Sequence, residues 1–375
     1  MCFGMIKCFA ATNSFWIDPQ GHVRPCARFG EKFDHITEFQ SFGEITQSEK
    51  HRNINDTLEK GQWPDSCVRC KSDEERGVFS KRSFYDRKHL HAPDDFMVDI
   101  SMGNFCNLKC RMCGPQNSTS WNSDYKHLVD NQIIKPKNID FAGYQLTDRD
   151  IEKLINHFRS VKGNIFIELK GGEPLIMPQT KKMVEHIISL DNVHKITLLI
   201  VTNATVFPGW LEQLSLKNKK IELVVSIDGI GDVFDYIRAN EKFSYQDCIK
   251  NVERFSKLGN IDLHFNVVVQ NLNIHQMLDV HLELTKFSRS INYIVLQFPD
   301  YLSANVMPIS ARKKIYQDFI DKQEQFGEYQ NLMKNIHDIL LTDPEAYLLK
   351  KFYRVMTSLD QLRNQDLYSV LPHFR

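Results

Sequence analysis

The 375-residue chain has no excess of charge of either sign, because Lys and Arg together number 47 and Asp and Glu together also number 47. A balanced total provides no general attraction to nucleic acid or to an anionic membrane surface. It therefore disfavours a protein that modifies RNA bases, although a local basic patch would be enough for that activity.

Long hydrophobic segments are also missing. The N-terminal residues MCFGMIKCFA lack the apolar core of a secretory signal. The longest largely apolar runs, such as Ile196–Val201, are far too short to cross a bilayer. We therefore expect a soluble, cytoplasmic protein with no membrane partner. In that reducing compartment, clustered thiols are typical of metal ligands rather than disulfides.

Cysteine is nearly absent from the last two thirds of the chain: eight of the nine cysteines precede residue 114, and only Cys248 follows. Cys248 lies at helical spacing with Tyr245, Val252 and Phe255, so we predict that it packs in the core. The first ninety residues carry many turn signals and little periodicity. This texture predicts a small domain that needs a bound metal for stability.

From about Asp95 the pattern changes to short β-like runs separated by segments with helical spacing. The alternation predicts parallel βα units, and the apolar runs indicate a sheet covered on both faces. Six units are too few for a closed eight-stranded barrel, so we predict an open α/β fold, either a partial barrel or a doubly wound sheet, with its site at the carboxyl ends of the strands. The predicted strands are Phe96–Ser101, Asn164–Lys170, Lys195–Thr202, Ile221–Ser226, Ile261–Gln270 and Ile291–Phe298, and helices follow from Ser310.

Three cysteines, Cys106, Cys110 and Cys113, lie in GNFCNLKCRMCGP directly after the first predicted strand. Three thiolates at this spacing fit three corners of a cubane [4Fe–4S] cluster, whose fourth iron then stays open to an outside ligand. Three structural cysteines or a zinc site are the alternatives that spacing alone leaves open.

Polar motifs follow the later strands. In Lys170–Pro174, paired glycines allow a ligand to approach the backbone closely, and Glu173 can accept hydrogen bonds from an ammonium group. Arg238 can bind a carboxylate through two parallel hydrogen bonds. A plain turn and a surface ion pair are the corresponding structural interpretations.

Taken in order, these motifs resemble the radical S-adenosylmethionine (SAM) superfamily, whose signature is C-x3-C-x2-C after the first strand of a partial (β/α)6 barrel. The resemblance covers roughly residues 96–299 and implies a [4Fe–4S] cluster with SAM bound at its open iron. Met112 stands where the family often has an aromatic residue beside the adenine. The resemblance assigns further cofactor contacts to Gly171, Gly172, Glu173, Thr202, Asn203, Ser226, Asp228, Arg238 and Val268.

A second group of cysteines precedes the predicted barrel. The pair Cys67 and Cys70 can place two thiolates on one metal or cluster, and Cys8 and Cys26 complete a set of four. Their spacing, with four residues between Gly21 and Cys26, resembles SPASM/twitch domains, which implies an auxiliary [4Fe–4S] cluster. In that family the domain usually follows the barrel. A zinc ion and unbound thiols remain alternatives, and Cys2 is a possible substitute for Cys8.

We therefore predict a twitch/SPASM-like domain at 1–92, a radical SAM partial barrel at 93–309 and a helical extension at 310–375. By resemblance, the protein would take an electron from a reductant such as flavodoxin or ferredoxin, cleave SAM to a 5′-deoxyadenosyl radical, and abstract hydrogen from a substrate. The expected substrate is a peptide or protein side chain, which would be oxidised or cross-linked, or a small polar metabolite. RNA-base modification is one alternative. A non-enzymatic iron–sulfur or zinc-binding protein is another, but it would leave the strand-end motifs without a role. The sequence identifies no catalytic side chain.

Overall fold

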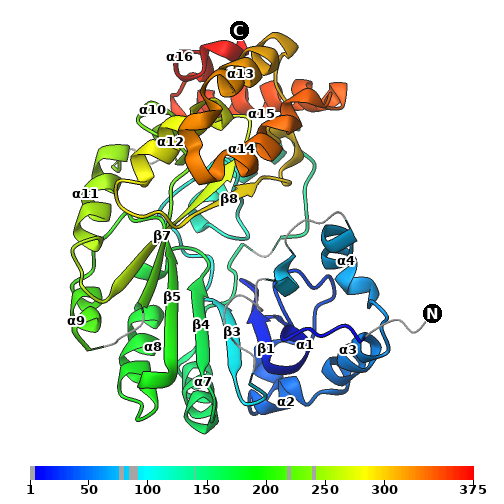
Figure 1. Cartoon of the computed structure of the whole chain (residues 1–375), viewed down its shortest axis with the longest axis vertical. Coiled ribbons are helices and arrows are strands. Elements are labelled where there is room, and N and C mark those ends of the chain that lie inside the picture. Colours follow the sequence, from blue (N-terminus) through cyan, green and yellow to red (C-terminus); the bar gives the residue numbers. More distant parts are fainter. Residues whose placement is uncertain (1–4, 76–79, 84–91, 140, 218–220, 239–241) are drawn as a thin grey trace. The chain divides into compact units, whose positions relative to one another are not determined.

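The computed structural model describes every residue except 1–4, 76–79, 84–91, 140, 218–220 and 239–241, so Cys2 lies outside the described residues (Figure 1). The chain divides into two compact units. Unit 1 comprises Met1–Phe105, Ala142–Val201 and Pro208–Glu222, and unit 2 comprises Cys106–Phe141, Thr202–Phe207 and Leu223–Arg375. Each unit is therefore built from segments that are separated in the sequence.

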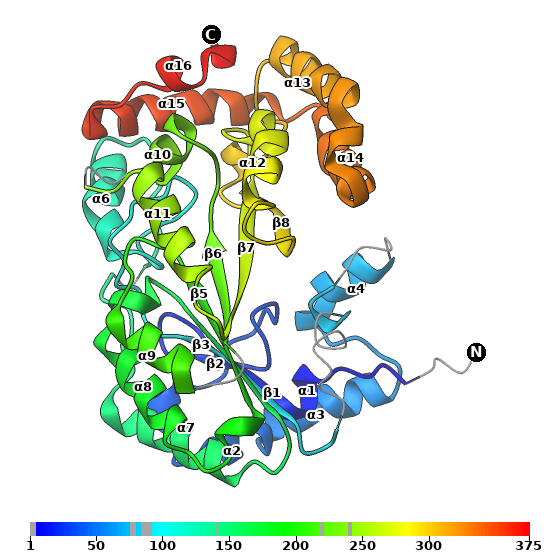
Figure 2. The same cartoon turned by 60° about the vertical axis from the view of Figure 1, so that its left-hand side comes forward.

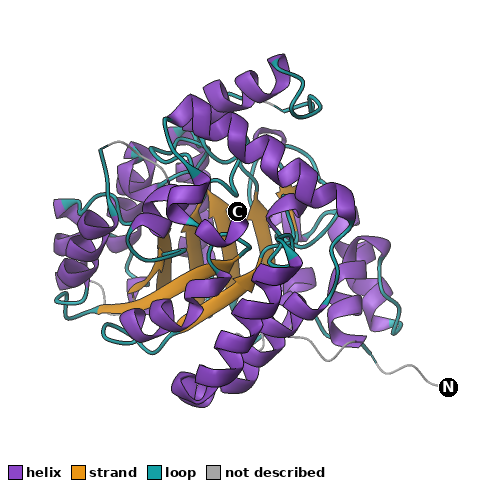
Figure 3. Ribbon diagram, turned by 90° about the horizontal axis from the view of Figure 1, so that it is seen from above, coloured by secondary structure: helices purple, strands orange, loops and turns teal. Residues whose placement is uncertain are grey.

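Strands and helices alternate along most of the chain, which confirms the predicted α/β class (Figure 3). The strands are β1 (Ser14–Ile17), β2 (Val23–Arg24), β3 (Phe96–Ser101), β4 (Ile165–Lys170), β5 (Ile196–Thr202), β6 (Ile221–Ser226), β7 (Ile261–Val269) and β8 (Ile291–Val295). Their order in the sheet is β2-β1-β3-β4-β5-β6-β7-β8, so among the described residues the sheet does not close into a full barrel. The six predicted strands are β3 to β8, each within three residues of its expected ends.

Helices follow most of these strands. In the first half of the chain they are α1 (Ala10–Asn13), α2 (Gly43–Thr46), α3 (Glu49–Glu59), α4 (Val68–Glu75), α6 (Asn122–Asp130), α7 (Asp148–Ser160) and α8 (Pro178–Ile188). In the second half they are α9 (Gly209–Lys217), α10 (Asp232–Arg238), α11 (Tyr245–Phe255), α12 (Met277–Leu284), α13 (Ile309–Lys322), α14 (Gln330–His337), α15 (Ala346–Arg363) and α16 (Leu367–Val370). The last four form the predicted helical C-terminal extension.

The N-terminal region contributes two strands that the sequence did not predict. β1 pairs in parallel with β3, Phe15 lying opposite Val98, and pairs antiparallel with β2, Trp16 lying opposite Arg24. With only four and two residues, β1 and β2 are too short to show a clear alternating pattern. The cysteine-rich N-terminal region therefore extends the sheet of unit 1 beyond β3.

Helix α7 illustrates how the sequence covers one face of this sheet. Thr147 and Asp150 form a capping box, each side chain accepting a hydrogen bond from the backbone N–H of the other. The buried side chains of α7 recur at helical spacing on one face: Ile151, Leu154, Ile155 and Phe158. The Phe158 ring lies 6.5 Å from that of Phe96 at the start of β3. The apolar stripe therefore packs on the sheet.

In unit 2 the long helix α15 contacts α6 and α16, and α16 also contacts α10 (Figure 2). Cys248 on α11 has no exposed surface, which confirms its prediction as a core residue. Within the described ranges, no helix has both the length and the apolar character that a membrane crossing requires.

The packing of α7 predicts a large stability difference between two leucine substitutions in unit 1. Leu154 is completely buried, whereas Leu216 on α9 is 80% exposed. Leu154→Ala should lower the free energy of unfolding by about 2–5 kcal/mol, because it leaves a cavity. Leu216→Ala should change it by less than about 0.5 kcal/mol. Urea denaturation followed by circular dichroism measures both values, and similar losses in the two variants would contradict this packing.

Candidate functional site

The loop that contains Cys106, Cys110 and Cys113 follows β3 in the sequence, and from Cys106 onward it belongs to unit 2. Cys106 is buried, Cys110 and Cys113 are half-buried, and none of the three forms a disulfide in the described structure. Burial and, to a smaller extent, the neighbouring Cys110 raise the pKa of Cys113 to about 12. Thiols in such a setting need a metal or nearby positive charges before they carry a negative charge.

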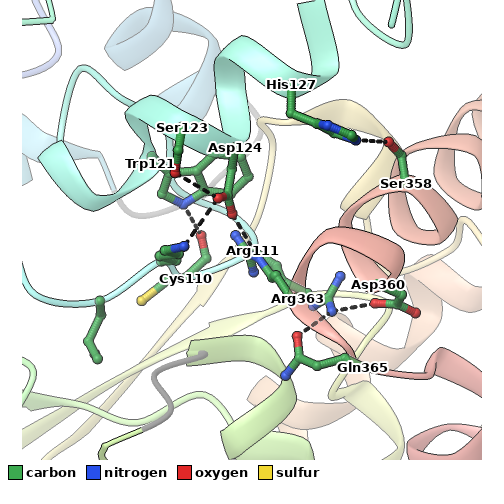
Figure 4. A network of polar contacts seen from close by, with 12 residues as sticks. Cys110, Arg111, Trp121, Ser123, Asp124, His127, Ser358, Asp360, Arg363 and Gln365 are labelled. Carbon is green, nitrogen blue, oxygen red and sulfur yellow. Dashed lines mark hydrogen bonds and ion pairs between the residues drawn. The ribbon is translucent and has the colours of Figure 1, made fainter.

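Side chains from the next segment hold the backbone of this loop. Ser120 Oγ donates a hydrogen bond to the Cys106 carbonyl oxygen at 2.7 Å, and Trp121 Nε1 donates to the Cys110 carbonyl oxygen at 2.8 Å. Figure 4 shows the second of these contacts beside the Cys110 side chain. The backbone carbonyl groups of Cys106 and Cys110 thus accept hydrogen bonds from protein side chains, and these bonds hold the loop in a defined conformation.

The end of β5 reaches the first cysteine. Asn203 Nδ2 lies 3.8 Å from Cys106 Sγ and donates to Asn107 Oδ1 at 3.1 Å. Asn107 in turn donates to Thr205 Oγ1 at 2.9 Å. Thr202 Oγ1 accepts from the backbone N–H of Ala204, which keeps this turn closed. Of the two residues predicted here, the structure brings Asn203 directly to a cysteine sulfur.

Arg238 and Asp228 form a buried ion pair beside the second cysteine. Arg238 Nη2 lies 2.7 Å from Asp228 Oδ2, and Arg238 Nη1 lies 3.9 Å from Cys110 Sγ. Asp228 Oδ1 also accepts from the backbone N–H of Val268 at 2.7 Å. Burial raises the pKa of Asp228, an effect that the charge of Arg238 opposes. The sequence suggested that Arg238 binds a ligand carboxylate, but part of its guanidinium group already binds a protein carboxylate.

Arg238 nevertheless retains an unused donor, because its Nε is buried and has no hydrogen-bond partner in the described structure. Ser226 and Met112 of unit 2 were also predicted to contact the cofactor. Ser226 ends β6, and Met112 is half-buried between Arg111 and Cys113. Among the described residues, neither makes a contact that indicates a role.

In unit 1, the predicted glycine turn packs tightly against the end of β3. Gly171 and Gly172 have positive φ angles of 82° and 48°. A Cβ on Gly172 would lie 2.2 Å from the carbonyl oxygen of Phe105, the residue before Cys106. Glu173 donates its backbone N–H to the same oxygen at 2.8 Å, and its carboxylate accepts from the backbone N–H of Leu175. Glu173 is therefore buried and oriented by local hydrogen bonds.

Sequence reasoning missed a polar row on one face of the unit 1 sheet. Arg24, Trp16, Asp99 and Glu168 lie opposite one another on β2, β1, β3 and β4. Lys170 forms ion pairs with both Asp99 and Glu168. Burial, followed by the charge of Glu168, raises the pKa of Asp99 to about 6. The signal was present in the sequence, since charged residues at alternate positions in apolar strands mark one polar face.

The four N-terminal cysteines lie within electrostatic reach of one another in unit 1. Burial, then Cys26, raises the pKa of Cys8 to about 12, with a smaller contribution from Cys70. Burial, then Cys26, Cys8 and Cys70, raises the pKa of Cys67 to about 12. The four thiols that the sequence grouped therefore lie close enough to influence one another, and their role as one ligand set stays a prediction. In the described part of the chain, no three His, Cys, Asp or Glu side chains are arranged as ligands of a metal ion.

Two family models match the chain in these regions. The radical SAM superfamily model matches residues 100–284, and the model of the SPASM iron–sulfur cluster-binding domain matches residues 8–71. The chain belongs to the radical SAM superfamily. The radical SAM fold binds SAM and a [4Fe–4S] cluster, and SPASM domains bind auxiliary iron–sulfur clusters. The cofactors predicted from the sequence are therefore confirmed as those of the family.

Curated relatives are distant. A GTP 3′,8-cyclase of Clostridium botulinum is 23% identical over 237 residues, which is 62% of this chain and 64% of that protein. The GTP 3′,8-cyclase of Aquifex aeolicus is 22% identical over 56% of this chain and 58% of its own length. This chain thus spans less than two thirds of the length of these relatives.

Among solved structures, anSMEcpe with bound AdoMet is 18% identical, with a TM-score of 0.46, over 63% of this chain and 60% of that one. Streptococcus suis SuiB bound to the precursor peptide SuiA is 16% identical, with a TM-score of 0.39, over 70% of this chain and 60% of that one.

The glycine turn gives a direct test of its geometry. Gly172→Ala should destabilise the protein by more than about 1 kcal/mol, because the methyl group meets the Phe105 carbonyl and the positive φ is unfavourable for alanine. Gly209→Ala, where the added Cβ meets no atom within 4 Å, should be neutral or stabilising. Thermal unfolding of the two variants against the wild type measures the difference. A neutral Gly172→Ala would show that the turn is not held in this conformation.

Proposed function

We propose that the protein is a radical SAM enzyme whose reactive [4Fe–4S] cluster is held by Cys106, Cys110 and Cys113. When bound, the reduced cluster supplies the electron that cleaves SAM to methionine and a 5′-deoxyadenosyl radical. The observation that carries the proposal is the setting of the cysteine loop: three buried or half-buried thiols, with Arg238 Nη1 3.9 Å from Cys110 Sγ and Asn203 Nδ2 3.8 Å from Cys106 Sγ. Cationic and amide donors stabilise the negative charge of ligating sulfur.

In unit 2, Arg238 and Asp228 beside the loop would supply contacts for the cofactor. The buried, unused Nε of Arg238 is a donor for an anionic group, while Asp228 holds the rest of that side chain in place. Family resemblance assigns the methionyl ammonium group to Gly171, Gly172 and Glu173 in unit 1. The positive φ angles of the two glycines fit a turn that lets a ligand approach the backbone.

For the substrate we propose a polar, charged molecule, either a peptide side chain or a small polar metabolite. Support comes from the row in unit 1, which places Trp16, Asp99 and Glu168 on one face of strands that would otherwise be apolar. Trp16 Nε1 and Asp99 Oδ1 are buried and without hydrogen-bond partners in the described structure, so a donor and an acceptor remain for a ligand. The relatives named GTP 3′,8-cyclase extend the second class to purine nucleotides.

The auxiliary cysteines, Cys8, Cys26, Cys67 and Cys70, are proposed to bind a second [4Fe–4S] cluster through four thiolates. Such a cluster would either accept an electron from a substrate radical or stabilise the N-terminal region. We assign the electron donor to the class of small one-electron carriers, flavodoxins or ferredoxins. Base modification in RNA is the weaker alternative, because the net charge is zero.

The cluster assignment predicts the iron content and the SAM chemistry of a triple variant. Anaerobically reconstituted wild-type protein should bind about eight irons, the sum of two cubane clusters. Simultaneous replacement of Cys106, Cys110 and Cys113 by Ala should remove about half of this iron and abolish release of 5′-deoxyadenosine. Cys248→Ala, which removes a core cysteine outside both groups, should leave both values unchanged. Continued SAM cleavage by the triple variant would refute the assignment. In the wild type, 5′-deoxyadenosine release against peptide and nucleotide panels then separates the substrate classes.

The auxiliary site is tested in that same triple variant. Mössbauer spectroscopy should show one remaining [4Fe–4S] cluster that does not respond to SAM, because four thiolates leave it no open iron. Adding Cys67→Ala and Cys70→Ala should remove this cluster and destabilise the N-terminal region. Zinc in place of the remaining iron, found by elemental analysis, would overturn the second-cluster proposal.

A further inference from the structure

Two buried arginine side chains near the cysteine loop differ in how their hydrogen-bond donors are used. Arg111, which follows Cys110, has a partner for each of its three side-chain nitrogens. Its Nε and Nη1 bind the Tyr236 carbonyl oxygen at 2.9 Å and Met356 Sδ at 3.3 Å, and its Nη2 binds Asp360 Oδ1 at 2.5 Å and Gln365 Oε1 at 2.8 Å. All three side-chain nitrogens of Arg111 are therefore used in hydrogen bonds within the protein.

Arg363, the last residue of α15, differs because only one of its side-chain nitrogens has a hydrogen-bond partner in the described structure. Its side chain is only 5% exposed, and its Nε donates to Asp124 Oδ2 at 2.8 Å. Its two terminal nitrogens, Nη1 and Nη2, are buried and have no hydrogen-bond partner in the described structure. Buried polar groups without partners are costly and uncommon, so these nitrogens indicate an acceptor that the protein itself does not provide.

Arg363 lies beside a side chain that holds the cysteine loop. Its guanidinium group lies 5.0 Å from the ring centre of Trp121, the side chain that donates to the Cys110 carbonyl (Figure 4). On the other side of the same cysteine, Arg238 Nη1 lies 3.9 Å from Cys110 Sγ. The two arginines thus place positive charge next to the part of the loop that contains Cys110.

The carboxylate of Asp124 does not cancel this charge. Asp124 also forms an ion pair with Lys109 at 3.2 Å, so one carboxylate faces two cations. Figure 4 shows Asp124 between the cysteine loop and the end of α15. The local balance is therefore positive beside Cys110.

We propose that Arg363 raises the reduction potential of the cluster held by the cysteine loop, and so makes its one-electron reduction easier. This inference rests on the proposed function, because it takes Cys106, Cys110 and Cys113 as cluster ligands. A [4Fe–4S] cluster with three thiolates is already anionic, and reduction by a small electron carrier adds one more negative charge. A fixed positive charge nearby stabilises the reduced form, and N–H donors to sulfur act in the same direction. Arg363 thus acts through the cluster and contacts no reacting atom of the substrate.

The test is a redox titration of the reconstituted full-length protein, following the EPR signal that changes when SAM is added. Arg363→Gln should shift the reduction equilibrium about tenfold toward the oxidised cluster, which is about 59 mV for one electron. Arg363→Lys, which keeps the charge, should stay close to the wild type. Arg354→Gln, an exposed arginine on the same helix that donates to the Gln132 carbonyl, removes the same charge from the chain and should have no effect.

A second variant reverses the sign of the expected shift. Asp124→Asn removes the negative charge beside Arg363 with little change of shape, so it should move the potential upward. It also decides the matter if Arg363→Gln loses its iron. An unchanged potential in Arg363→Gln with full iron content, or a downward shift in Asp124→Asn, would overturn the inference. Failure of the proposed function looks different, because wild-type protein would then show no SAM-responsive signal at all.

Discussion

Arg111 follows Cys110 in the loop whose cysteines are cluster ligands in our proposal. Its side chain has no exposed surface. An arginine charge buried without compensation would be very unfavourable, so the rest of unit 2 must supply partners for it. Asp360 provides the opposite charge and accepts hydrogen bonds from the Tyr236 hydroxyl and the Leu367 backbone as well. The Tyr236 ring lies 3.6 Å below the guanidinium group. One buried cation thus connects the cysteine loop, α10, α15 and α16.

The same demand for compensation recurs at the other charged positions. Arg238 is matched by Asp228, and Lys170 by Asp99 and Glu168. In the unit that contains the cysteine loop, two buried arginines are matched incompletely: the Nε of Arg238 and the terminal nitrogens of Arg363 have no hydrogen-bond partner in the described structure. A radical SAM protein has to stabilise an anionic cluster and a zwitterionic cofactor, and surplus buried cationic donors suit both tasks.

Much of this arrangement was predictable because it depends on local pattern. The strands β3 to β8 are runs of apolar residues, and the cysteine spacings are read directly from the chain. β1 and β2 were missed because four and two residues carry too little periodicity. The row from Arg24 to Glu168 was missed because each strand was judged by its overall apolar character, not by its alternate positions. The ion pair of Asp360 with Arg111 could not be predicted, since 249 residues separate the partners and no local signal links them.

The parallel pairing of β1 with β3 has a consequence for how the chain assembles. Phe15 lies opposite Val98, so β1 can pair with β3 only after the whole cysteine-rich region between the two strands has been synthesised. During synthesis on the ribosome, β1 therefore emerges with one edge unpaired, and pairing over such a separation is slow. The four cysteines of the proposed auxiliary site also precede β3, so all four thiols are synthesised before the sheet can be completed.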